Sequence, residues 1–156
     1  MPESHSSSEI SPQWRGFHHI ALVTPDLDAT IEFYRDVLGM QVLFTAPPTD
    51  INGRHVAILP GEGFLGLHFF EQLDAKLFTP PDLETLYWLP GALNHIAFAL
   101  PDEAAGLAFR ERLQSHGVEM TEIMLQGDMA YNMLFQDNNG MLLEVAWPKP
   151  TSETQS

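Results

Sequence analysis

The chain of 156 residues contains no cysteine, and it has only seven lysine and arginine residues against 21 aspartate and glutamate residues. Without cysteine it can form neither a disulfide nor a thiolate metal site, so any metal must bind histidine, aspartate or glutamate. The formal net charge of −14 leaves no basic face of the kind that nucleic-acid binding requires. We therefore expect no nucleic-acid partner, and the shortage of cations disfavours strongly anionic substrates.

Long apolar stretches are also missing from the chain. No window approaches ~18 consecutive apolar residues, so we expect neither a transmembrane helix nor a membrane partner. The N-terminal segment is rich in serine and acidic residues, and it lacks the basic-then-apolar order of a secretion signal. A cytoplasmic protein is the resulting expectation. With 44% hydrophobic residues, a chain of this length can bury the core of one compact domain.

The most informative feature that is present is an internal repeat. Residues 19–26 read HIALVTPD and residues 95–102 read HIAFALPD, which gives five identities in eight positions at an offset of 76. The same offset relates His68 to Glu144. A chain that repeats at such a period consists of two copies of one supersecondary unit.

Each copy has the pattern of a β-α-β-β-β module. Apolar runs closed by turn residues predict strands at 17–24, 40–45, 54–59 and 64–71, and again at 93–100, 118–125, 131–136 and 141–147. Apolar residues at helical spacing predict one helix in each copy, at 27–38 and 102–116. We expect a single domain over 15–148, built from a module at 15–71, a linker at 72–91 and a module at 92–148. The segments 1–14 and 149–156 are expected to be tails.

Equivalent points of the two copies carry residues that bind divalent metals, namely His19, His68, His95 and Glu144. Because strand side chains alternate between faces, His19 shares its face with Ala21, and His68 shares its face with Gly66. The opposite faces carry bulky apolar residues suited to packing against helices. Two-fold pseudo-symmetry would bring the four side chains toward one axis, where they could surround a single ion and leave room for water or substrate.

Four segments, in this order, carry a family likeness: HHIALVTPDLDATIEFYRDVLGMQV, GLHFFE, NHIAFALPD and FQDNNGMLLEVAW. They resemble the vicinal oxygen chelate superfamily, which includes glyoxalase I, bleomycin-resistance proteins and extradiol dioxygenases. The resemblance implies an α+β fold of two tandem βαβββ modules that form a cupped mixed sheet with helices on the outside. It also implies one divalent metal ion (nickel, zinc, cobalt, manganese or iron) held by His19, His68, His95 and Glu144.

The chain departs from the family pattern at one ligand, and the resemblance does not decide how the modules pair. In the glyoxalase and epimerase branches the position of His68 is commonly glutamate or glutamine. Modules of this fold pair within one chain or exchange across a homodimer, and a homodimer is expected here. Candidate substrate contacts are Arg54, Phe70, Trp88 and Tyr131.

Three functions are compatible with these residues. The first, which we favour, is a glyoxalase I-like lyase or isomerase, in which a metal holds two vicinal oxygens of a small substrate and stabilises an enediolate. Glu144 is then both ligand and proton-transferring base, as its family counterpart implies. The second is an iron-dependent extradiol dioxygenase with His19, His95 and Glu144 as facial triad, although Leu134 stands where those enzymes usually carry tyrosine. The third is a non-enzymatic small-molecule binding or resistance protein.

Overall fold

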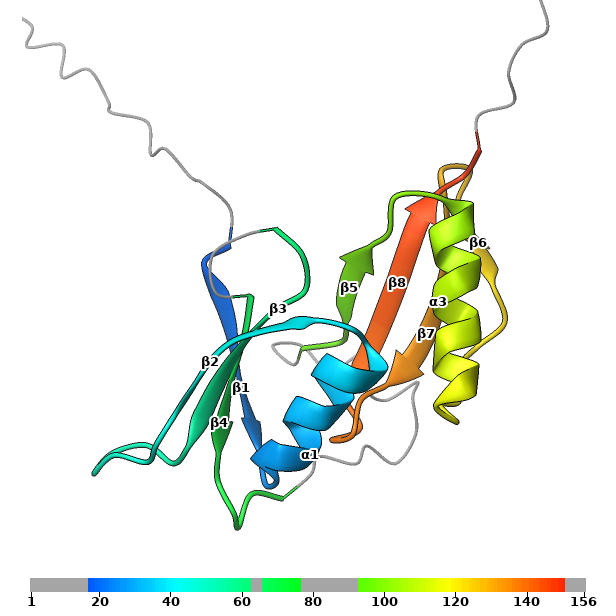
Figure 1. The fold of residues 1–156 in the computed structure, drawn as a ribbon. Helices are drawn as coiled ribbons and strands as arrows, with labels where there is room; N and C mark the ends of the chain where they lie inside the picture. The colour runs from blue at the N-terminus through cyan, green and yellow to red at the C-terminus, as the bar shows by residue number, and fades with distance from the viewer. Residues whose placement is uncertain (1–16, 63–65, 77–92, 151–156) are drawn as a thin grey trace, which may run out of the picture.

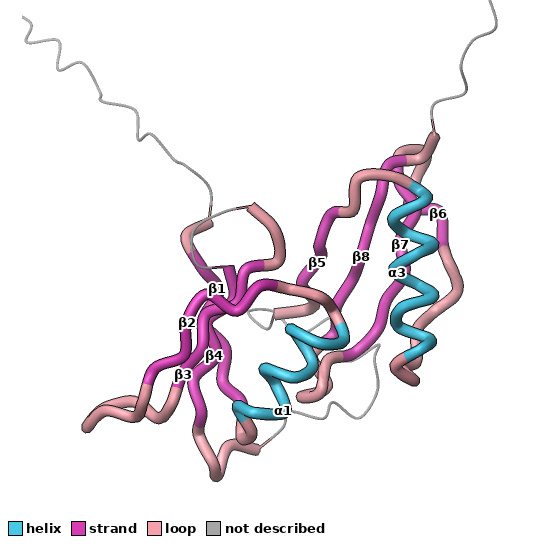
Figure 2. Tube along the Cα trace, viewed as in Figure 1, coloured by secondary structure: helices cyan, strands magenta, loops and turns pink. Residues whose placement is uncertain are grey.

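A computed structural model describes residues 17–62, 66–76 and 93–150 of the protein. These residues form two four-stranded mixed sheets, one for each copy of the repeat, and each sheet is accompanied by a helix (Figures 1 and 2). The α+β fold of two βαβββ modules is therefore confirmed. The predicted tail at 1–14, most of the linker at 72–91 and the end of the chain from residue 151 lie outside the described residues.

The first module contains β1 (His19–Thr24), α1 (Leu27–Glu32), η1 (Phe33–Val37), β2 (Gln41–Ala46), β3 (His55–Leu59) and β4 (Gly66–Glu71). Its strand order is β1-β4-β3-β2, in which β1 is parallel to β4 and the other neighbours are antiparallel. Helix α1 contacts β3 and β4. One face of this sheet is thus covered by the helix of its own module.

The second module contains β5 (Ile96–Ala99), α3 (Glu103–Ser115), β6 (Met124–Gln126), β7 (Ala130–Gln136) and β8 (Leu142–Pro148). Its strand order is β5-β8-β7-β6, and again the first strand is parallel to the last and the others are antiparallel. Helix α3 contacts β8. The two modules therefore share one topology, as the repeat predicts.

Both helices begin where the sequence predicts. The side chains of Asp26 and Asp102 each cap a helix by accepting a hydrogen bond from the backbone N–H three residues further on, at 2.9 Å in both modules. Gly39 follows the first helix with φ of 75°, the left-handed conformation that favours glycine after a helix end. Residues 33–37 form a π-helical turn instead of the expected α-helix. One π-helical turn is too short for the spacing of apolar residues to distinguish it from an α-helical turn.

The strand predicted at 118–125 is wrong for most of its length. In this part of the chain only Met124–Gln126 form a strand, and before it Met120 makes an isolated bridge with Phe135. The hydroxyl of Thr121 accepts a hydrogen bond from the backbone N–H of Leu134 at 3.0 Å. A side chain thus replaces a backbone partner, which interrupts the ladder in a way that an apolar pattern does not reveal.

The two modules share one hydrophobic core on the helix-bearing sides of their sheets. Leu67 and Phe69 of the first sheet belong to the same buried cluster as Leu143, Val145 and Trp147 of the second. Figure 1 shows α1 between the two sheets in this view. The helix-bearing faces are therefore turned toward a common interior.

Buried and exposed polar contacts strengthen the same junction. The hydroxyl of Tyr34 donates a hydrogen bond to Oδ2 of Asp137, at the turn between β7 and β8, over 2.9 Å. The guanidinium of Arg112 on α3 donates to the backbone carbonyls of Asp36 and Val37 at 2.7 and 2.6 Å.

Among the described helices, none is long and apolar enough to cross a membrane.

Candidate functional site

Three imidazole rings cluster on the face of the first sheet that is opposite α1. In the strand register His68 on β4 lies between Ala21 on β1 and Ala57 on β3. The ring centroid of His68 is 5.7 Å from that of His19 and 5.2 Å from that of His55. We call this surface the histidine face. It contains two of the predicted metal ligands and a third histidine, His55, that was not among them.

His68 has the properties of an available nitrogen ligand. Its Nε2 atom is buried and has no hydrogen-bond partner in the described part of the chain. Burial lowers the pKa of His68 from its ordinary value of 6.5, and the neighbouring His55 and His19 lower it further. The aromatic rings of Phe70 and Phe44 lie beside it, with centroids at 4.4 and 5.8 Å. The lowered pKa favours the neutral imidazole, which is the state that binds a metal.

The second sheet presents a carboxylate on its own helix-free face. Glu144 on β8 is only 4% exposed. Its Oε1 accepts a hydrogen bond from Nδ2 of Asn132 on β7 at 3.0 Å, and its Oε2 lies 3.2 Å from Nε2 of His95. The other ring nitrogen of His95 lies 2.6 Å from Oδ1 of Asn94. We call this surface, where Ala97 pairs with Glu144 in the register, the glutamate face.

The structure thus brings the four predicted ligands together as two pairs. His19 lies with His68 on the histidine face, and His95 lies with Glu144 on the glutamate face. Within residues 17–62, 66–76 and 93–150, no three histidine, aspartate or glutamate side chains are grouped closely enough to hold one metal ion. Each face therefore offers half of the predicted donor set.

Both faces are open beside these pairs. Val23 on β1 is 58% exposed although it is apolar, and the small residues Ala21, Ala97 and Ala99 are exposed as well. Two buried polar atoms without a hydrogen-bond partner in the described ranges lie on these faces, one on His68 and one on Asn132. Such atoms are uncommon in folded proteins, so each of them calls for an explanation.

Arg54 and Tyr131, two of the predicted substrate contacts, lie away from both faces. The guanidinium of Arg54 is 2.6 Å from Glu71 and 3.1 Å from Asp28 on α1, so its charge is already paired on the helix side of the first sheet. Tyr131 pairs with Trp147 in the register, and their ring centroids are 6.4 Å apart on the core side of the second sheet. Neither residue is retained as a substrate contact.

The other two predicted contacts have different outcomes. Phe70 lies on the histidine face, with its ring centroid 5.3 Å from that of His55. Trp88 lies outside the described residues. Asn132, which donates a hydrogen bond to Glu144, is a contact to a predicted ligand that the sequence did not single out.

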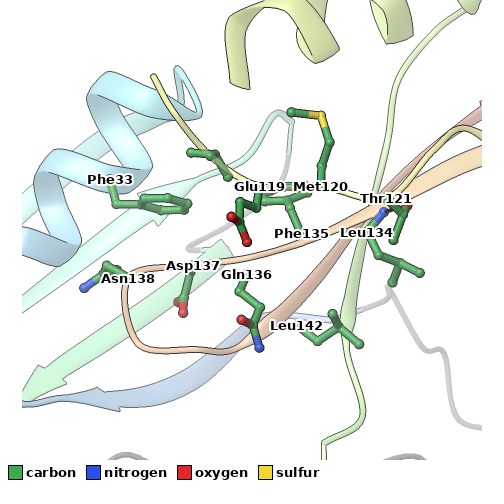
Figure 3. Close-up of a pocket in the computed structure, with 11 residues that line it drawn as sticks. Phe33, Glu119, Met120, Thr121, Leu134, Phe135, Gln136, Asp137, Asn138 and Leu142 are labelled. Carbon is green, nitrogen blue, oxygen red and sulfur yellow. Dashed lines mark hydrogen bonds between the residues drawn. The ribbon is translucent and has the colours of Figure 1, made fainter. Parts of the chain in front are cut away.

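A groove of about 680 Å³ opens between η1 and the end of the second sheet. Figure 3 shows Phe33, Met120 and Phe135 on its walls together with the carboxyl group of Asp137. Burial raises the pKa of Asp137 above its ordinary value of 3.8. The residues that line this groove include none of the four predicted metal ligands, but one of them, Leu134, pairs with Glu144 in the strand register.

Residues 16–145 match the family model of the Glyoxalase/Bleomycin resistance protein/Dioxygenase superfamily, and the chain belongs to this superfamily. No curated protein matches the chain in sequence. The order of elements and the repeated topology agree with this membership.

Solved structures show the same fold. A glyoxylase/bleomycin resistance protein/dioxygenase domain from Frankia sp. EAN1pec is 20% identical with a TM-score of 0.72, covering 90% of this chain and 96% of its own. Lactoylglutathione lyase from Agrobacterium tumefaciens is 22% identical with a TM-score of 0.60, covering 87% and 96%. A mutant of the fosfomycin resistance protein FosX from Listeria monocytogenes, complexed with Mn(II) and 1S,2S-dihydroxypropylphosphonic acid, is 20% identical with a TM-score of 0.66, covering 88% and 95%.

Proposed function

We propose that the protein is a divalent-metal-dependent enzyme whose site is completed by a second copy of the chain. In an isologous homodimer the histidine face of one copy meets the glutamate face of the other, and the two-fold axis creates two equivalent sites. Each site would hold one ion through His19 and His68 of one copy and His95 and Glu144 of the other. The observation that carries this proposal is the division of the donors into two open pairs within one chain.

Closure of a site within one chain would require the two faces to turn toward each other. The shared core and the hydrogen bond between Tyr34 and Asp137 instead hold the helix-bearing faces together. Separating the modules would expose residues such as Phe69 and Leu143, and burial of each such side chain stabilises the fold by ~1.5–3 kcal/mol. A second copy supplies the missing pair without this loss.

The residues present fit the chemistry of a divalent metal site. Three imidazoles and one carboxylate are donors that suit nickel, zinc, cobalt, manganese or iron, and the unpartnered Nε2 of His68 is one such donor. When bound, the ion supplies a Lewis acid that polarises two adjacent oxygens of a small substrate. Glu144, which Asn132 and His95 contact, would be the base that takes a proton from a carbon bearing one of those oxygens and returns it to the adjacent carbon. This supports lyase or isomerase chemistry of the glyoxalase I type.

The surroundings of the two pairs favour a substrate without strong negative charge. Arg35, Arg54 and Arg110 pair with carboxylates, and Arg112 is held by backbone carbonyls. Phe44, which is 40% exposed, and Phe70 add apolar surface next to His68. A small molecule with two vicinal oxygens and an apolar or aromatic remainder fits this surface better than an anionic conjugate does.

Complementation between two defective variants tests the proposal. One variant carries His19→Ala with His68→Ala, the other carries His95→Ala with Glu144→Ala, and neither alone should bind stoichiometric metal. When the two are refolded together, half of the dimers are mixed and one of the two sites in each mixed dimer is intact. Metal content after dialysis against zinc or nickel should therefore recover to about 25% of the wild-type value, because an isologous dimer shares each site between copies.

The control and the opposing outcomes use the same protocol. His116→Ala changes a histidine at the C-terminal end of α3 and should leave metal content at the wild-type level. Mixed dimers without any recovered metal would refute a site shared between copies. Wild-type protein that binds no divalent metal would refute metal dependence and favour a small-molecule binding protein, whereas bound iron with oxygen uptake on catechols would favour an extradiol dioxygenase.

A further inference from the structure

Asn132 makes an asymmetric set of contacts on the glutamate face. It is 7% exposed, and its Nδ2 donates a hydrogen bond to Oε1 of Glu144 at 3.0 Å. Because a carboxylate only accepts hydrogen bonds, the NH₂ group must face Glu144, and the carbonyl oxygen of the amide must point elsewhere. That oxygen is buried and has no hydrogen-bond partner among the described residues.

This asymmetry separates a role toward Glu144 from a role in the stability of β7. A buried carbonyl oxygen without a partner costs ~1–3 kcal/mol, so an amide that served stability alone would have partners for both polar atoms. A leucine of similar size would avoid that cost, but it would leave Oε1 of Glu144 without its donor. The amide is therefore explained by what it does to the carboxylate.

We propose that Asn132 is a positioning residue for Glu144. By occupying one lone pair of Oε1, the amide fixes the rotation of the carboxylate and leaves Oε2, which lies 3.2 Å from Nε2 of His95, to face the ion and the substrate. Groups that hydrogen-bond to a metal ligand in this way typically account for a factor of ~10–100 in metal affinity. The inference rests on the proposed function, because it concerns the same site.

The test compares variants of Asn132 with cobalt(II) as the probe. Asn132→Leu and Asn132→Ala remove the donor, and Asn132→Gln keeps an amide on a longer side chain. Affinity comes from competition with a chelator, and the visible absorption of bound cobalt(II) reports the geometry of its ligands. We expect Asn132→Leu and Asn132→Ala to weaken binding ~10- to 100-fold and to shift the absorption bands, and Asn132→Gln to restore part of the affinity.

Gln136→Leu is the matched control, because Gln136 is an exposed residue four positions further along β7 on the same face, and it should leave affinity and spectrum unchanged. Wild-type protein that binds no cobalt(II) would refute the proposed function, and this inference with it. Wild-type binding that persists with equal affinity and spectrum in folded Asn132→Leu or Asn132→Ala would overturn the positioning role alone. Since these two substitutions differ in size, either one that folds decides the question, and circular dichroism verifies folding.

Discussion

Replacement of Tyr34 by phenylalanine would remove one oxygen atom at the point where the two modules are joined. Tyr34 is 0% exposed, and its hydroxyl donates to Oδ2 of Asp137 at 2.9 Å. The other carboxyl oxygen of Asp137 accepts hydrogen bonds from the backbone N–H groups of Asn139 and Met141, both at 2.8 Å. Phenylalanine keeps the ring and its contact with Phe69. The substitution therefore isolates a single buried hydrogen bond.

The magnitude of the effect follows from the charge and burial of the acceptor. Hydrogen bonds to charged groups stabilise folded proteins by ~1.5–3 kcal/mol, and the substitution leaves Oδ2 of Asp137 buried without this donor. We expect the free energy of unfolding to fall by about 2 kcal/mol, within that range. For a domain of about 150–250 residues this corresponds to a melting temperature lowered by about 4–8 °C.

Urea unfolding followed by circular dichroism measures this loss. The protein concentration is held fixed because the stability of the proposed dimer would depend on concentration. A double-mutant cycle with Asp137→Asn separates the coupling between the two side chains from the effect of each substitution alone. Metal content should stay at the wild-type level, since Tyr34 lies on neither the histidine face nor the glutamate face. A loss below ~0.5 kcal/mol, the size of an ordinary surface substitution, would contradict the role of this bond in joining the modules.

Two further substitutions test the core and the buried carboxyl group. Gly106→Ala should destabilise the fold, because the added Cβ would lie 2.6 Å from ring atoms of Trp147, and overpacking costs ~1–3 kcal/mol against a gain in helix propensity of ~1 kcal/mol. Thermal unfolding with no loss of stability would contradict that packing. Burial raises the pKa of Asp137 above 3.8, so its contribution to stability is present below pH 3.8 and is lost as the pH rises through the raised pKa. The melting temperature of Asp137→Asn relative to wild type should therefore increase from about pH 4 upward and then level off, whereas a constant difference would mean that the carboxyl group titrates normally.

The side-chain alternation in the sequence was sufficient to predict which sheet faces carry the candidate ligands. His19 and Ala21 share the helix-free face of β1, while Leu143 and Val145 lie in the core on the opposite face of β8 from Glu144. These assignments depend only on the two-residue period of a strand, which tertiary packing does not change. The helix caps were predictable because a capping aspartate acts on the helix that follows it, and the repeated topology was predictable because the sequence repeats at an offset of 76.

The relation between the two faces could not be predicted from the sequence. His68 and Glu144 are equivalent in the repeat, but the packing of the helices decides whether they meet within one chain. The contact between Asn132 and Glu144 depends on the register of β7 and β8, which the composition of either strand leaves open. Tyr131 was predicted as a substrate contact because the sequence does not show this register. The register pairs Tyr131 with Trp147 on the core side of the second sheet.

A site shared between copies makes metal binding and dimerisation interdependent. The coupling free energy between the two binding events is reciprocal. An ion that contacts both copies must therefore strengthen dimerisation by the same factor by which dimerisation strengthens binding of the ion. If pairing of the faces raises metal affinity tenfold at each of two sites, the dimer gains about 1.4 kcal/mol per site, or a hundredfold in its dissociation constant. Sedimentation equilibrium should therefore show more monomer after treatment with a chelator and less after zinc is restored. A dissociation constant that does not depend on metal, in protein that binds one ion per chain, would place all four ligands within a single chain.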